Sequence, residues 1–116
     1  MKFVHLLGKR ARERIIELLA SSRSYSELAN QLGISTAAIS KYLSGKTHPS
    51  DAVLLRALDI ATPEEKEVII NIILEEFAEG LKDLFTWASS ESVLTREHLR
   101  MIESVIYEAY LRPPSR

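Results

Sequence analysis

The residue types that most often carry catalysis or hold metal ions are scattered along the chain. Its three histidines, His5, His48 and His98, fall in different predicted elements and share no metal-ligand spacing. The 116 residues include no cysteine, which excludes disulfides, zinc–cysteine sites and thiol catalysis. The acidic residues from Glu75 to Glu79 fall on a polar helix face and are interpreted as solvated. Because no glycine-rich phosphate loop or nucleophile motif is present, we expect no enzymatic activity, no metal and no cofactor.

The charge of the chain is distributed unevenly, although it sums to −1. Residues 1–50 hold eight Lys/Arg against three Glu, a net charge of +5, and residues 51–116 hold seven Lys/Arg against thirteen Asp/Glu, a net charge of −6. A basic half suggests a polyanionic partner, although charge also varies along chains without a function. No apolar run approaches the roughly 18 residues of a membrane span, and the N-terminal apolar residues are too few for a signal peptide. We therefore expect a cytoplasmic protein that does not enter a membrane.

Residues 25–44 are the most informative stretch, in which two short predicted helices flank a tight turn. Ser24 and Ser35 precede the helices as N-cap residues, and Gly33 ends the first because glycine adopts the left-handed conformation without strain. The small Ala29 allows the helices to cross closely. The buried face is apolar and consists of Leu28, Leu32, Ile34, Ile39 and Tyr42. The other positions of the second helix are small or polar, and such a helix fits the DNA major groove, which is about 12 Å wide.

This stretch resembles the Cro/CI repressor family, the XRE-type helix-turn-helix DNA-binding domains. The matching segments are Glu27-Leu28-Ala29 and Leu32-Gly33-Ile34-Ser35 in the first helix and turn, Ile39-Ser40-Lys41-Tyr42 in the recognition helix, and Gly45-Lys46 with Pro49-Ser50 in the exit loop. The resemblance covers about residues 9–60 and implies double-stranded DNA as the partner. The alternative is a pair of packed helices without a role in DNA binding. The coincidence of the motif with the basic half favours DNA.

The resemblance also implies which side chains contact DNA. In this family the first residues of the recognition helix reach base edges, and here these are Thr36 and Ala37, followed one turn later by Ser40 and Lys41. A lysine can donate to guanine, and Thr36 and Ala37 can contact a thymine methyl group. Five residues are placed for phosphate contacts, namely Ser24, Tyr25, Ser35, Lys46 and Thr47. The basic run at residues 9–14 is interpreted as a solvated helix face, with phosphate contact as the weaker alternative.

Helical periodicity continues through the rest of the chain, without a β-hairpin pattern. One helix is expected over residues 3–20, with an interruption near its start at Gly8. Further helices are expected from Ser50 to about residue 60, from Thr62-Pro63-Glu64-Glu65 to about Ala88, and from Thr95 to about Leu111. The predicted fold is all-α. A helix-turn-helix domain of about four helices occupies residues 1–61, and two amphipathic helices follow at residues 62–116.

The long helix has a wider apolar face than one partner requires. Its apolar residues between Ile69 and Ala88 fill an arc of about 180°, whereas a helix with one partner needs little more than about 100°. We expect it to contact both its own domain and a second copy of the chain. The expected dimer interface contains Ile69, Ile73, Phe77, Leu81, Leu84 and Phe85. An intramolecular lid is the alternative, and a protein partner or small effector on the acidic half is a third interpretation.

Together these features predict a sequence-specific DNA-binding transcription regulator that acts as a homodimer on a palindromic operator. Two other classes stay open. One is a protein-interaction adaptor, such as a coactivator-like bridge or an antitoxin whose acidic half holds a partner. The other is a DNA-binding accessory to recombination or plasmid maintenance.

Overall fold

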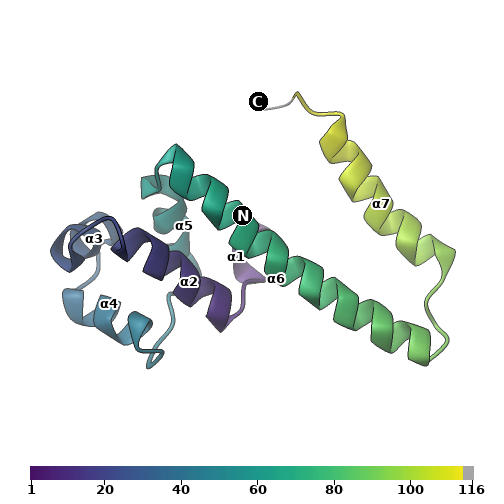
Figure 1. Cartoon of the computed structure of the whole chain (residues 1–116), viewed down its shortest axis with the longest axis horizontal. Coiled ribbons are helices and arrows are strands. Elements are labelled where there is room, and N and C mark those ends of the chain that lie inside the picture. Colours follow the sequence, from purple (N-terminus) through teal and green to yellow (C-terminus); the bar gives the residue numbers. More distant parts are fainter. Residues whose placement is uncertain (114–116) are drawn as a thin grey trace. The chain divides into compact units, whose positions relative to one another are not determined.

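The computed structural model describes residues 1–113, and these residues are helical almost throughout (Figure 1). They form seven α-helices and no strand: α1 (Lys2–His5), α2 (Lys9–Ala20), α3 (Tyr25–Leu32), α4 (Thr36–Leu43), α5 (Asp51–Ile60), α6 (Pro63–Ser90) and α7 (Arg96–Tyr110). The predicted all-α fold is thus confirmed. Among these helices none combines the length and the low polarity that a bilayer-spanning segment requires.

The helix expected over residues 3–20 is divided into α1 and α2 at Gly8. Gly8 has an extended backbone, with φ −79° and ψ 177°, and precedes α2 as its N-cap. Its N–H donates to the Oε2 atom of Glu76 on α6, at 2.9 Å. The break therefore replaces a helical hydrogen bond with one that ties the start of α2 to α6.

The chain consists of two compact units, one of residues 1–78 and one that begins at Glu79, with the boundary inside α6. The first unit extends past residue 61 because α6 completes its core. Ile69, Ile72 and Ile73 are buried in the same cluster as the apolar side chains of α1 to α5. The largest fully buried side chains are Val4, Ile15, Ile16, Leu19, Leu28, Leu32, Ile39, Leu54 and Ile69. Each stabilises the fold by about 1.5–3 kcal/mol, so this core holds α3 and α4 in a fixed arrangement.

The second unit contains the end of α6 and the whole of α7. The chain turns at Ser92, which has φ 58°, and the N–H of Val93 donates to the carbonyl of Ala88 at 2.9 Å. Thr95 then begins α7 with a capping box. Its Oγ1 accepts from the N–H of His98, and the Nδ1 of His98 accepts from the N–H of Thr95. None of the residues of α7 is buried.

Candidate nucleic-acid interface

The turn between α3 and α4 is fixed by its own backbone and caps. Ser24 begins α3 by accepting a hydrogen bond from the N–H of Glu27 at 3.1 Å. Gly33 ends α3 in the left-handed region, with φ 69° and ψ 34°, and the N–H of Ile34 returns to the carbonyl of Ala29 at 3.0 Å. Ala29 itself is buried, as the close crossing of the two helices requires. The short turn therefore fixes the direction in which α4 leaves α3.

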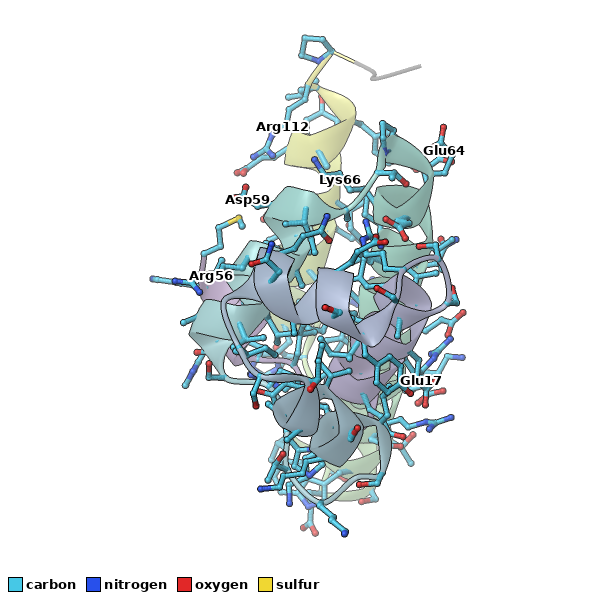
Figure 2. The ribbon with its side chains drawn as sticks, turned by 90° about the vertical axis from the view of Figure 1, so that its left-hand side faces the viewer. Glu17, Arg56, Asp59, Glu64, Lys66 and Arg112 are labelled. Carbon is cyan, nitrogen blue, oxygen red and sulfur yellow. The ribbon has the colours of Figure 1, made fainter. Side chains whose placement is uncertain are left out.

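Arg56 on α5 holds this turn from outside. Its Nη1 donates to the carbonyl of Leu32 at 2.8 Å, which satisfies one of the free carbonyls at the end of α3. The guanidinium lies against Gly33, where any added Cβ would overlap the Nη1 atom of Arg56. Figure 2 shows Arg56 and Asp59 of α5 on one side of the face formed by α3 and α4, and Glu17 of α2 on the other. No local spacing in the sequence links Arg56 to this turn, so its role is visible only in the folded chain.

The four residues expected to contact bases share the outer face of α4. Thr36, Ala37, Ser40 and Lys41 are all exposed. The opposite face of α4 is buried through Ile39 and Tyr42. Within the described residues the ammonium group of Lys41 has no hydrogen-bond or ion-pair partner, so it is available to an external acceptor.

Of the five residues expected to contact phosphates, two have hydroxyls that cap helices. Ser24 caps α3, and Ser35 accepts from the N–H of Ala38 at 3.1 Å to cap α4. Their hydroxyls are engaged, but both side chains are exposed at helix N-termini, where backbone N–H groups favour anions. Tyr25, Lys46 and Thr47 are exposed as well. The structure therefore places all five on the surface, at the start of α3, the start of α4 and the loop that leaves α4.

The exit loop after α4 is held at both ends. At its start the N–H of Lys46 donates to the carbonyl of Lys41 at 2.9 Å, and Gly45 turns with φ 76°. At its end Arg12 of α2 donates from Nη1 to the carbonyl of Pro49 at 2.9 Å. Arg12 also donates to the carbonyls of Val4 and Leu7 and to Asp51 Oδ1 at 2.7 Å. Its side chain is 12% exposed, so Arg12 is a structural anchor of the loop and is not free for phosphate.

The comparison with protein families agrees with this geometry. Residues 16–60 match the model of the family described as Helix-turn-helix. The match supports a helix-turn-helix domain like those of the Cro/CI family over this segment. It begins within α2, ends with α5 and includes all of α3, α4 and the exit loop. Domains of this family bind DNA. No curated protein and no solved structure matches the chain.

A buried ion pair joins the helix-turn-helix domain to α6. Arg23, in the turn between α2 and α3, donates from Nη1 to Glu65 Oε2 at 2.8 Å and from Nη2 to Glu65 Oε1 at 2.9 Å. The hydrogen bond from Arg23 lowers the pKa of Glu65 to about 2. Burial opposes this shift, and hydrogen bonds from the N–H of Thr62 and the hydroxyl of Ser22 add to it. From the sequence, Glu65 could be recognised only as an acidic residue in the first turn of a helix. Its partner Arg23 lies 42 positions away, so no local spacing indicates the pair.

The residues expected at a dimer interface occupy different environments. Ile69 and Ile73 are 2% and 9% exposed, because both pack in the core beneath the helix-turn-helix domain. Phe77 is half-buried and packs against the same core. These three are therefore used by the first unit itself, which leaves little of their side chains for a second chain. Leu81 and Phe85 are half-buried in the second unit, and Leu84 is exposed.

Proposed function

We propose that the chain is a sequence-specific DNA-binding transcription regulator that acts as a homodimer on a palindromic operator. The observation that carries this proposal is the outer face of α4. Its four exposed residues are short apart from Lys41, while the buried face fixes the helix to the core. A helix with short side chains can approach the base edges closely, and one long donor then reaches further into the groove.

Each contact follows from the chemistry of the side chain. Lys41 donates to O6 or N7 of a guanine, and Thr36 and Ala37 contact the methyl group of a thymine. Lys46 and Thr47 in the exit loop, together with Tyr25 and the N-termini of α3 and α4, contact phosphates on either side of the groove. The phosphate contacts set the register of α4, and the base contacts provide the specificity.

A homodimer would raise the affinity for DNA, because a single α4 offers only a few residues that can contact bases. Two-fold symmetry would present the two copies of α4 to half-sites about 34 Å apart, which is one turn of DNA. Binding of the first half-site raises the effective concentration at the second. A palindromic operator is the DNA sequence that matches this symmetry.

The direct test is selection of bound sites from random duplex DNA by the full chain. We expect a palindromic consensus with a guanine in each half-site. Recovery of a single, non-repeated half-site would contradict the homodimer but not the role of α4. Failure to enrich any sequence would contradict sequence-specific binding.

A second candidate function is a protein-interaction adaptor or antitoxin. The observation that favours it is α7, which has no buried residue although Ile106, Tyr107 and Tyr110 are apolar or aromatic. In this case the partner of α7 is another protein rather than a second copy. The same selection separates the two classes, since an adaptor without DNA specificity yields no consensus. The genes beside the coding sequence, such as a toxin or a recombinase, distinguish an antitoxin from an accessory to recombination or plasmid maintenance.

A further inference from the structure

An apolar groove opens within the second unit, between the end of α6, the turn and the start of α7. It has a volume of about 380 Å³, and its walls include Leu84, Phe85, Trp87, Met101 and Ile102. Trp87 is 58% exposed and Met101 is 65% exposed, so the groove is open to solvent. A soluble protein rarely leaves such a surface uncovered unless it binds something.

α7 carries a second apolar stripe that does not line this groove. Leu99, Ile106 and Tyr110 follow at spacings of seven and four residues, which places them on one face of the helix. Their exposed fractions are 40%, 52% and 82%. Each copy of the chain therefore has both an open apolar groove and an unpartnered apolar helix face. Because one chain carries both the groove and the helix face that could fill it, two copies can pair isologously, each inserting its helix face into the groove of the other.

The charges on α7 favour one orientation of such a pair. Arg96 and Arg100 lie in its first half, where Glu97 is the one acidic residue, and Glu103 and Glu108 lie in its second half, which holds no basic residue. Within the described residues neither these two arginines nor Glu103 and Glu108 have an ion-pair partner. Cations near a helix N-terminus and anions toward its C-terminus oppose the helix dipole, so this arrangement does not stabilise α7 by itself. Against an antiparallel copy of α7, each cationic half faces an anionic half.

We propose that α7 of a second copy, antiparallel to the first, occupies the groove through Ile106 and Tyr110, and that each copy does this reciprocally. The inference rests on the homodimer proposed above and names its surface. Ten large apolar residues of the second unit are exposed: Leu84, Trp87, Val93, Leu99, Met101, Val105, Ile106, Tyr107, Tyr110 and Leu111. Their exposed area is on the order of 1,000 Å², and a standard interface needs about 800 Å² from each partner.

The first test is sedimentation of the full chain, without DNA, at micromolar concentration. We expect a dimer for the wild type and for Ser104→Glu, and a dissociation constant at least about tenfold higher for Ile106→Glu. Ser104 is the matched control because it is exposed on the same helix, two residues and about 200° away. Circular dichroism verifies that both variants keep their helices. A monomeric wild type, or equal association of the two variants, overturns the proposal.

The fluorescence of Trp87 reports the groove directly, because it is the only tryptophan in the chain. As the protein concentration rises through the dimerisation range, the emission maximum of the wild type should shift to shorter wavelength. Ile106→Glu should show no shift over the same range. A wild-type dimer whose Trp87 emission stays constant means that the second copy binds elsewhere, which overturns the groove assignment and leaves the homodimer standing.

A charge exchange tests the antiparallel orientation. One variant carries Arg96→Glu and Arg100→Glu, and the other carries Glu103→Arg and Glu108→Arg. Each variant alone brings like charges together and should associate at least about tenfold more weakly, whereas an equimolar mixture should recover the wild-type affinity. Single variants that associate as tightly as the wild type contradict the antiparallel pairing, because a parallel pair already brings like charges together in the wild type. A mixture no tighter than the separate variants contradicts any pairing of the two α7 helices. These measurements use no DNA, so a dimer with this behaviour that enriches no DNA sequence would refute the regulator and keep the inference.

Discussion

Arg23 and Glu65 form a bidentate ion pair that joins the helix-turn-helix domain to α6, with N–O distances of 2.8 and 2.9 Å. The two side chains are 9% and 11% exposed. Arg23 also donates to the carbonyls of Leu19 and Ile60, at the ends of α2 and α5. The pair thus closes the junction at which α2, α5 and α6 meet. Its charges are buried, so the removal of one partner leaves an uncompensated charge.

The pH dependence of stability should reflect Glu65. The pKa of Glu65 is about 2 in the fold, below its ordinary value of 4.5, so the ionised carboxylate stabilises the folded state. This contribution is fully present above pH 4.5 and is lost as the pH falls toward 2. Urea unfolding at a series of pH values should show a loss of stability across this window that is reduced in Glu65→Gln.

At neutral pH we expect Glu65→Gln to destabilise the fold by roughly 3 kcal/mol, because Arg23 stays buried without its countercharge. Glu64→Gln is the control, since Glu64 is exposed beside it in the same helical turn. Equal stability of the two variants would show that the ion pair does not hold the junction.

Gly33 should tolerate substitution poorly. Its positive φ of 69° and the guanidinium of Arg56 both oppose a side chain at this position. Gly33→Val should cost about 1–3 kcal/mol from backbone strain alone. Gly80→Ala is the contrasting variant, because Gly80 is in the interior of α6 with open space around its Cβ position. It should stabilise the chain by about 0.5–1 kcal/mol. Both values are obtained from thermal or denaturant unfolding, and a neutral Gly33→Val would exclude strain at the turn.

Arg12 should be irreplaceable by lysine. Its guanidinium reaches three carbonyls and Asp51, which a single ammonium group does not satisfy together. We expect Arg12→Lys to lower the free energy of unfolding by about 1–3 kcal/mol, because buried acceptors lose their donor. Arg10→Lys is the control, since the Arg10 side chain is 73% exposed. The measurement is the midpoint of urea unfolding for each variant relative to the wild type. Shifts of similar size in both variants would show that the hydrogen bonds of Arg12 do not stabilise the loop.

Lys46 should act through phosphate alone. Lys46→Ala should weaken binding to all DNA sequences to a similar degree and lower the slope of log K against log[salt] by about one. Titrations at several salt concentrations measure this slope. A change in base preference, with the slope unaltered, would place Lys46 in the groove instead of on the backbone.

Local chemistry made most of the fold predictable. Ser24, Gly33, Ser35 and Thr95 each act through residues three or four positions away, so their roles as caps are visible in the sequence and present in the structure. Arg12, Arg23 and Arg56 each donate to a residue at least 24 positions away in the chain. No periodicity encodes such pairs.

The wide apolar arc of α6 illustrates the same limit. The sequence indicated that this helix has more than one apolar contact. Only the packing shows that Ile69 and Ile73 serve the core, while the exposed apolar surface lies in the second unit around Leu84, Trp87 and α7. The pattern of a helix gives the number of its apolar faces but not the partner of each face.

The proposed contact of α4 with DNA bases is tested most directly by Lys41→Ala. The measurement compares the affinities of the wild type, Lys41→Ala and the exposed-lysine control Lys66→Ala for a selected site, its single-base variants and random DNA. We expect Lys41→Ala to lose about 1–3 kcal/mol of discrimination at one base pair in each half-site, whereas Lys66→Ala keeps it. Unchanged binding of Lys41→Ala to both selected and random DNA would contradict the assignment of α4 as the recognition helix.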